Sequence, residues 1–435
     1  MRAAEYRRES KCKGETLRMR MQISRVLAVS GAVSLLSFTN VAAATPAALE
    51  GVPRVDHVVV LVLENESYSA TWSSGSAAKY LNGLAKVGAF VPNYYATGHV
   101  SLDNYIAMTS GVAGPQIGPT YTDCLGLNLW ACTQNVSLAA PVNLADQIEG
   151  AGLTWKQYSD GTTGQCVHAD YSRTAQGQDP YQGNGGTPTN AGAGKDYADR
   201  HVPWLYYSNI IENTARCNAH LQPFTELSAD LAGNRLPSYS FITPDTCNDG
   251  HDNPSCSGGR PGGLTAADAF LAAHVPALLT WLRAHNGVLI ITFDEGGAND
   301  TAGCCTGGPG GTAGFGGQVG MLVLGAPVAT GSTATKYDHA SLLRTSEDLL
   351  GISTHLNNAA SAAPITGIWT QPVAPASLGP VSSGSTTTDP TASAANPAGA
   401  LPNTSASSGL PAAVALALAV PVLAAPALRR RRAAR

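Results

Sequence analysis

Two long apolar runs constrain the fold of this 435-residue chain more than any other feature. Residues 58–63 read VVVLVL and residues 288–293 read VLIITF, and residues 319–324 (VGMLVL) form a weaker third run. Continuous apolar runs of this length, rich in β-branched residues, are typical of parallel strands whose sheet is covered on both faces. The sequence therefore predicts a buried, mostly parallel sheet.

Helical patterns separate these strands. An apolar repeat of helical period runs through residues 264–285 and stops at Asn286-Gly287, and shorter helices are expected at residues 143–149 and 341–350. Strands that alternate with helices predict the α/β class. We expect a three-layer α/β/α sandwich around a central, mostly parallel sheet, formed by residues 55–367.

Polar and acidic residues directly follow both strong apolar runs. Glu64 and Asn65 follow the first run, and Asp294 and Glu295 follow the second. In open α/β sheets ligands bind outside the carboxyl ends of the strands, so we expect these side chains at one edge. Clustered carboxylates repel one another, and a divalent cation removes that repulsion. We predict that they bind a metal ion; the alternative is that they are exposed acids at strand ends.

A serine precedes a third helical pattern. After Ser101 the apolar residues fall at positions 102, 105, 106 and 108, which predicts an amphipathic helix beginning near Ser101. Backbone N–H groups and the helix dipole at such an end favour a bound anion. Ser101 is therefore a candidate nucleophile, although a serine there can equally be an N-cap alone. His99 is close enough in sequence to contact the same anion.

Two further segments carry histidines and an aspartate. Asp245 and His251 lie in one loop rich in Gly, Asn and Cys, and can reach one metal or one phosphate. His339 precedes the helix expected at residues 341–350. The alternatives are turn chemistry for the loop, because Asn, Asp and Gly dominate turns, and a structural role for His339.

Together these segments resemble the bacterial phosphoesterase family, which includes acid phosphatases and non-zinc phospholipases C. The resemblance covers about residues 55–355, and its motifs occur in the family's order. They are ENESY (64–68), HVSLDNYIAMTSG (99–111), RHVPWLY (200–206), PDTCNDGHD (244–252), FDEGG (293–297) and DHASLLRTSEDLLG (338–351).

The resemblance implies a fold and a site. The family belongs to the alkaline phosphatase superfamily, which implies an alkaline-phosphatase-like sheet between helices and a covalent phosphoryl-enzyme on Ser101. It implies a phosphate contact for Asn104. One or two divalent metal ions are implied, with ligands at Glu64, Asn65, Asp294 and Glu295. Asp245, His251 and His339 fall at the second metal site of the two-metal members. The alternative for the two histidines is a direct phosphate contact, and either is a candidate catalytic residue that assists the leaving oxygen as a general acid or electrostatic partner.

The two ends of the chain differ from its centre. Residues 1–44 contain basic residues, an apolar run and a small-residue cleavage site, which predict a signal peptide after a doubtful N-terminal extension. Residues 370–409 are rich in Pro, Ser, Thr and Gly and predict a flexible stalk. Residues 410–435 are an apolar segment with a basic tail, a candidate membrane or cell-wall anchor. Residues 401–405 (LPNTS) resemble the Gram-positive sorting signal, with Ser405 in the place of its Gly. We expect a secreted protein retained at the cell surface.

Charge and cysteine content constrain the partners and the compartment. Half of the 26 basic residues lie at the two ends, so the centre is acidic and no nucleic acid is expected as a partner. Eight of the nine cysteines follow the predicted signal peptide, and an even number in an exported chain indicates disulfides. Cys124–Cys132 and Cys247–Cys256 are plausible pairs, and Cys304 and Cys305 form a vicinal bridge or pair elsewhere.

The sequence therefore predicts an exported, metal-dependent phosphoester hydrolase whose partner is a phosphate-ester small molecule or a lipid head group. A phosphomonoesterase of the acid phosphatase type, acting through a phosphoserine, fits best. One alternative is a phospholipase C-type phosphodiesterase acting on lipid head groups. Another is an inactive surface protein that binds phosphorylated ligands.

Overall fold

The computed structural model describes residues 49–113, 143–167, 196–251, 256 and 259–370. These residues belong to one compact unit, Met1–Ala376, and the second unit, Ser377–Arg435, lies outside them. The predictions of a signal peptide, a stalk, an anchor and a Cys124–Cys132 pair likewise fall outside the described residues.

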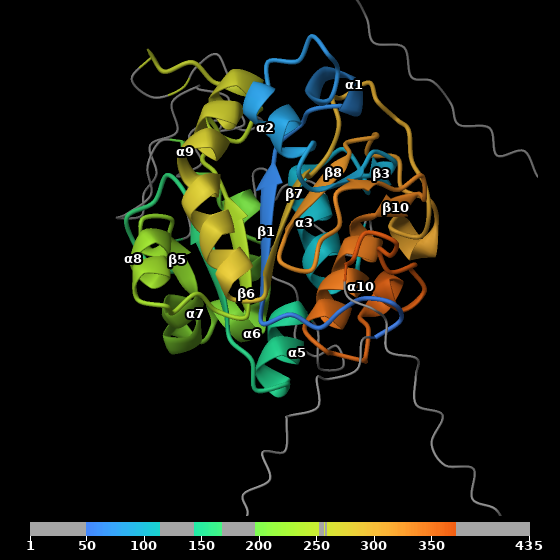
Figure 1. Cartoon of the computed structure of the whole chain (residues 1–435). Coiled ribbons are helices and arrows are strands. Elements are labelled where there is room, and N and C mark those ends of the chain that lie inside the picture. The colour runs from blue at the N-terminus through green and yellow to red at the C-terminus, as the bar shows by residue number, and fades with distance from the viewer. Residues whose placement is uncertain (1–48, 114–142, 168–195, 252–255, 257–258, 371–435) are drawn as a thin grey trace, which may run out of the picture. The chain divides into compact units, whose positions relative to one another are not determined.

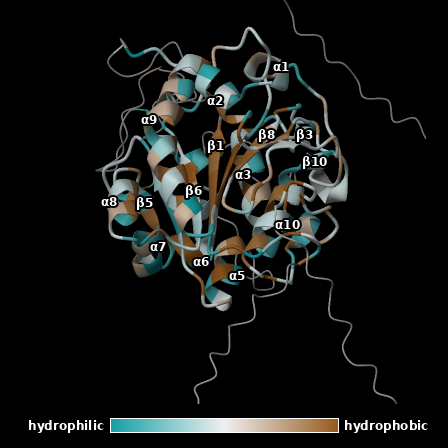
Figure 2. Ribbon diagram, in the orientation of Figure 1, coloured by the Kyte–Doolittle hydropathy of each residue, from teal (hydrophilic) through white to brown (hydrophobic). Residues whose placement is uncertain are grey.

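The centre of the molecule is an eight-stranded sheet with the strand order β5-β4-β6-β1-β7-β8-β2-β9. Strand β1 (His57–Leu63) lies between β6 (Tyr239–Thr243) and β7 (Gly287–Phe293), and is parallel to both. The side chains of β1, β6 and β7 are almost all buried, and the central strands are strongly hydrophobic in Figure 2. The remaining strands are β2 (Ala89–Val91), β3 (Tyr94–Tyr95), β4 (Trp155–Ser159), β5 (Leu221–Pro223), β8 (Met321–Gly325), β9 (Gly331–Ser332) and β10 (Tyr337–Asp338).

The α/β class and the mostly parallel sheet are confirmed, with one difference in strand direction. Strand β8 begins at Met321, two residues later than predicted, and runs antiparallel to both β7 and β2. A parallel return to the sheet needs a long crossover, usually a helix. The chain between β7 and β8 has only a short 3₁₀ turn, Pro309–Gly311, so it comes back in the opposite direction.

Helices cover the sheet. Helix α9 (Gly263–Ala284) crosses in front of the strands in Figure 1, packs on β7 and contacts α2. Among the described helices it alone is long and apolar enough to cross a membrane, but its face from Ala267 to Leu282 is buried against the sheet. Helices α3 (Ser101–Ser110) and α10 (His339–Leu349) pack against each other. The other helices are α1 (Tyr68–Thr71), α2 (Lys79–Leu84), α5 (Leu144–Gly150), α6 (Ser208–Ile211), α7 (Thr214–His220) and α8 (Glu226–Ala232).

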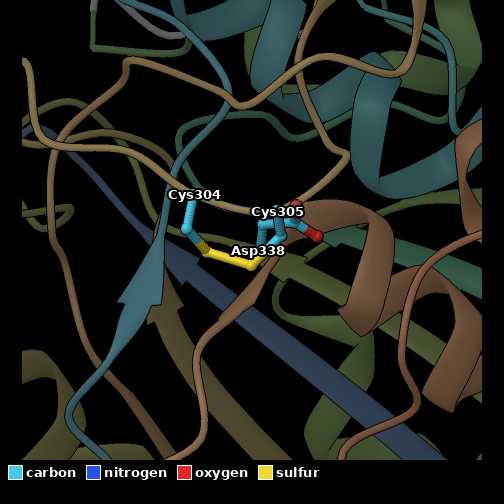
Figure 3. A group of neighbouring side chains, drawn as sticks. All are labelled: Cys304, Cys305 and Asp338. Carbon is cyan, nitrogen blue, oxygen red and sulfur yellow. A yellow bond between two sulfur atoms is a disulfide. The ribbon is translucent and has the colours of Figure 1, made fainter. Parts of the chain in front are cut away.

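Three disulfides lie within the described residues. The predicted Cys247–Cys256 pair and the vicinal Cys304–Cys305 bridge are present, and Cys166–Cys217 joins segments 51 residues apart. Beside the vicinal bridge lies Asp338 (Figure 3), whose side chain caps α10 by accepting a hydrogen bond from Ser341 N at 2.9 Å. The three side chains lie within metal-binding reach of one another, but both sulfur atoms are bonded to each other and offer no thiolate.

Candidate active site

The acidic segments predicted to meet do meet at one edge of the sheet. Strands β1 and β7 pair in register as far as Leu63 and Phe293, so Glu64 and Asp294 leave the sheet side by side. The backbone N–H of Asp294 donates to the Leu63 carbonyl at 2.9 Å. Asn65 then adopts a left-handed φ of 47°, which turns the chain sharply after Glu64. Such a conformation is uncommon for a residue other than glycine and is tolerated best by Asn and Asp.

Hydrogen bonds join the two strand ends to the Ser101 helix. Asn65 Nδ2 donates to Glu295 Oε1 at 2.9 Å, and Asn104 Nδ2 donates to Glu295 Oε2 at 3.1 Å. Asn104 is fully buried, and its Oδ1 accepts from the backbone N–H groups of Thr97 and Gly98. The amide of Asn104 is thus occupied by the segment that leads into α3. This geometry fits a bracing role better than the direct phosphate contact that the resemblance implied.

Ser101 points to the acidic edge and does not cap its helix. The N-cap of α3 is Val100, and Ser101 is the first helical residue, with 5% of its surface exposed. Its Oγ donates to Glu64 Oε2 at 3.0 Å. Tyr105, one helical turn later, donates its hydroxyl to Glu64 Oε1 at 2.5 Å. One helix face therefore holds both oxygens of a single buried carboxylate.

Glu64, His201 and Asp249 form a candidate metal centre. One possible ligand atom from each lies within 4.8 Å of the others, and all three residues are buried. His201 Nε2 lies 3.2 Å from Glu64 Oε1, and His201 Nδ1 lies 3.9 Å from Asp249 Oδ2. Asp249 reaches this place because its carbonyl accepts a hydrogen bond from the Glu64 N–H at 2.9 Å.

The donor atoms of this centre fit a divalent cation. Neither ring nitrogen of His201 nor Oδ2 of Asp249 has a hydrogen-bond partner among the described residues, and nor has Asn65 Oδ1 nearby. Buried polar atoms are normally satisfied, and each atom that is not needs an explanation. Carboxylate oxygens and imidazole nitrogens are ordinary ligands of borderline cations such as zinc. A cation would satisfy these atoms together.

Burial and like charge shift the protonation of the centre. Burial raises the pKa of Glu64 well above its usual range, and the nearby carboxylates of Asp294 and Asp249 raise it further. The pKa of His201 is held well below its usual range by burial, and the charges of Arg200 and His251 add to this. Without a cation the centre thus favours a protonated glutamate and a neutral imidazole. A bound cation reverses this preference for the acids, because positive charge favours carboxylates.

Asp245 does not join this centre. Its Oδ1 accepts hydrogen bonds from the backbone N–H groups of Cys247 and Asn248, and its Oδ2 lies 3.0 Å from an Arg260 nitrogen. Both oxygens are therefore engaged elsewhere, in a turn and an ion pair. The acid that the same loop places beside Glu64 is Asp249, four residues further along the chain.

The three histidines named from the sequence differ in their surroundings. Tyr94 OH lies 2.7 Å from His339 Nδ1, and the Asp294 carbonyl oxygen lies 2.6 Å from its Nε2, so both ring nitrogens are engaged. His339 thus holds the Asp294 backbone, a positioning role that leaves no nitrogen for general acid chemistry. His251 is partly exposed and close enough to His201 to lower its pKa. His99 Nε2 lies 2.9 Å from the Asp300 carbonyl oxygen.

Sequence reasoning missed His201, Asp249 and Tyr105. His201 lies in a segment that was quoted only for its resemblance to a family, and Asp249 lies in a loop from which Asp245 and His251 were chosen instead. Tyr105 carried a signal of its own, because residues four apart share a helix face and Tyr105 follows Ser101 by four. In the structure the Tyr105 ring stacks on His201 with the centroids 5.2 Å apart.

The chain is similar to several known proteins. The model of the phosphoesterase family matches residues 70–353. A phosphatidylinositol-3-phosphatase of Mycobacterium tuberculosis is 27% identical over 80% of this chain and 95% of its own length. A probable acid phosphatase of Kluyveromyces lactis is 27% identical over 66% of this chain, which spans only 56% of that protein. A protein in the alkaline phosphatase superfamily from Vibrio parahaemolyticus aligns with a TM-score of 0.45 and 12% identity, over 74% of this chain and 72% of its own.

The family match covers well over half of the chain and includes Ser101, His201, Asp249 and Asp294, which meet at one edge of the sheet. The chain therefore belongs to the phosphoesterase family and is a phosphoester hydrolase.

Proposed function

We propose that the protein is a metal-dependent phosphomonoesterase that acts through a phosphoserine at Ser101. The observation that carries the proposal is the hydrogen bond from Ser101 Oγ to the buried carboxylate of Glu64. Ser101 also begins α3, where the helix dipole stabilises the negative charge of a phosphate group. A hydroxyl held by a base at an anion-binding helix end is arranged for nucleophilic attack.

The proposed reaction has two steps. Ser101 Oγ attacks phosphorus, its proton passes to Glu64 Oε2, and the bond from phosphorus to the leaving oxygen breaks. His251, which is partly exposed at this edge, protonates the leaving oxygen. Water then attacks phosphorus and gives a proton to His251, the bond from phosphorus to Ser101 Oγ breaks, and Glu64 returns its proton to Oγ as phosphate leaves. His339 and Asn104 keep the two acidic strand ends in place through their hydrogen bonds to Asp294 and Glu295.

Glu64, His201 and Asp249 would hold the divalent cation, with Asn65 and Asp294 adjacent to it. When bound, such an ion neutralises charge on the phosphate and lowers the pKa of a coordinated hydroxyl. The unsatisfied ring nitrogens of His201 and the unsatisfied Oδ2 of Asp249, which lie within reach of Glu64, support this assignment.

We favour monoesters as substrates because the relatives that align are named acid phosphatases and a phosphatidylinositol-3-phosphatase. The last name adds a lipid head group as a candidate for the alcohol part of the ester. Comparing turnover of p-nitrophenyl phosphate with that of p-nitrophenylphosphorylcholine separates a phosphomonoesterase from the phospholipase C alternative.

Substitution of the nucleophile tests the proposal. Ser101→Ala should abolish turnover of p-nitrophenyl phosphate and leave thermal unfolding nearly unchanged. Ser110→Ala is the matched control, because Ser110 lies at the other end of α3, where its Oγ donates to the Ile106 carbonyl and accepts from the Val112 N–H. Acid quenching with ³²P-labelled substrate should label the wild type on Ser101. Full activity in Ser101→Ala would contradict the proposal, and turnover by the wild type excludes an inactive binding protein.

We also propose that the protein is exported and held at the cell surface, as residues 1–44 and 370–435 suggest. Mass spectrometry of the mature N-terminus, together with cell fractionation before and after removal of residues 370–435, tests both parts. Retention in the cytoplasm with an intact N-terminus would contradict the proposal.

A further inference from the structure

A large hydrophobic side chain is exposed beside the candidate active site. Phe315 has 38% of its surface exposed, and the only other exposed large hydrophobic residue in the described part of the chain is Val87. The core otherwise buries its aromatic and aliphatic side chains thoroughly. A single exposed hydrophobic side chain is ordinary in a folded protein, so the case for a role rests on where the ring lies.

The loop that carries Phe315 is fixed to the segment leading into the Ser101 helix. Phe315 N donates to the Thr97 carbonyl at 3.0 Å, and Gly316 N donates to the Ala96 carbonyl at 3.3 Å. Glycines on both sides of Phe315 permit this close approach. A methyl group at Gly314 would lie 2.6 Å from the Ala96 carbonyl oxygen, and one at Gly316 would lie 2.5 Å from that of Gly98. The backbone beneath the ring is therefore held closely against residues 96–98.

The ring itself lies next to residues that immediately precede Ser101. Its centroid is 6.4 Å from that of His99, whose Nε2 is anchored on the Asp300 carbonyl. A methyl group at Gly98 would lie 3.7 Å from the ring Cζ atom, in ordinary van der Waals contact, so the ring lies directly beside this glycine. Phe315 and His99 thus form one partly exposed aromatic wall beside the start of α3.

This wall contrasts with the chemistry of the site. The groups that face Ser101 are polar or charged, and they suit the phosphate of a substrate. The alcohol part of the ester must leave the site towards solvent, where a partly exposed ring can contact it. Aromatic rings bind apolar and aromatic groups through burial and edge or stacking contacts.

Resting on the proposed function, we infer that Phe315 is a specificity-determining residue that contacts the leaving group and favours phosphate monoesters with an apolar or aromatic alcohol. The contact exists in both the bound substrate and the transition state, so its loss acts mainly on KM.

The test compares an aromatic with a polar monoester in the full chain. In Phe315→Ala, kcat/KM for 1-naphthyl phosphate should fall roughly fivefold to tenfold, mostly through KM, while that for glycerol 2-phosphate stays within about twofold. Phe315→Leu should lose less, because it keeps an apolar side chain. Inhibition by phenylphosphonate should weaken in parallel, whereas inhibition by inorganic phosphate should not change. Val87→Ala is the matched control, since it removes the other exposed hydrophobic side chain and should change neither substrate.

The possible outcomes separate the inference from the proposed function. An unchanged ratio of the two kcat/KM values in Phe315→Ala overturns the inference and leaves the proposed function intact. An equal loss for both esters also overturns it, because Phe315 would then only support the loop. A wild type that hydrolyses neither ester overturns both.

Discussion

Two groups of buried carboxylates occupy different parts of the molecule. The edge acids, Glu64, Asp249 and Asp294, lie at the carboxyl ends of the strands, and the distal acids, Glu347 and Asp348, lie in the last two turns of α10. Burial raises the pKa of Glu64, Asp249, Glu347 and Asp348 alike. A raised pKa therefore does not distinguish a functional acid from a structural one in this chain.

The neighbours of the two groups do distinguish them. Asp348 Oδ1 lies 2.8 Å from His355 Nε2 and its Oδ2 lies 3.6 Å from Arg344 Nε, so a histidine and an arginine lie beside its two oxygens. Glu347 Oε1 accepts the backbone N–H of Leu356 at 3.0 Å and ties the chain after α10 to the helix. The edge acids also have a cationic neighbour, Arg200, which lowers the pKa of Glu64 and Asp249, but burial and the neighbouring carboxylates outweigh it, and the imidazole beside them is held neutral. The distal acids join α10 to the chain that follows it, whereas Glu64 and Asp249 lie with His201 within reach of one proposed cation.

The largest expected difference between the two groups is in activity. Glu64→Gln removes the base for Ser101 and one candidate metal ligand, so kcat/KM for p-nitrophenyl phosphate should fall roughly a thousandfold or more. Glu347→Gln changes an acid of similar burial in the distal group. Its kcat/KM for the same substrate should stay within about twofold of the wild-type value. Steady-state kinetics on both variants measures the contrast. Similar losses in the two variants would remove the distinction between edge and distal acids.

The next effect concerns stability and pH. Burial raises the pKa of Glu347 to about 8, well above its value in the unfolded chain. Between about pH 4.5 and 8 the folded protein therefore keeps a proton that the unfolded chain has lost, and stability must fall as pH rises through this window. Glu347→Gln removes this contribution, which is on the order of 4 kcal/mol when complete.

Urea unfolding at pH 5 and pH 8 measures the effect in the wild type and in Glu347→Gln. Titrations common to both proteins cancel in the difference. The wild type should lose more stability between the two pH values than the variant. Equal losses would mean that Glu347 ionises normally in the folded state.

The sequence predicted that the candidate site lies at the carboxyl edge of the sheet, but it did not predict all residues of the candidate metal centre. Neighbouring parallel strands end at the same edge of a sheet. The two apolar runs were therefore enough to predict that Glu64 and Asp294 lie close together. His201 and Asp249 come from irregular segments whose paths depend on tertiary contacts, and no local period reveals them. The direction of β8 was missed for a similar reason. An apolar run does not reveal whether the strand is parallel or antiparallel to its neighbours, because the length of the connecting segment decides this.

A smaller effect should follow the binding of a cation to the edge acids. A ligand that binds only the folded state at a hundred times its Kd stabilises that state by about 2.7 kcal/mol. Titration with zinc, magnesium or calcium should therefore raise the Tm of the wild type by several degrees, and a chelator should reverse the rise. Asp249→Asn should reduce the shift strongly, whereas Glu347→Gln should retain it. A shift that is the same in Asp249→Asn would place the cation elsewhere.

The smallest effect tests whether the distal acids are truly neutralised within the fold. His355→Ala removes the hydrogen-bonded partner of Asp348, while Arg344 remains beside the other oxygen. The carboxylate then keeps one partner and is left partly unsatisfied, which costs about 1 kcal/mol. We expect a fall of about 2–4 °C in Tm with unchanged kcat/KM, because neither residue touches the edge acids. A loss of activity without a loss of stability would show that α10 transmits changes at its end to His339 and so to the site, and the two groups of acids would then be coupled rather than separate.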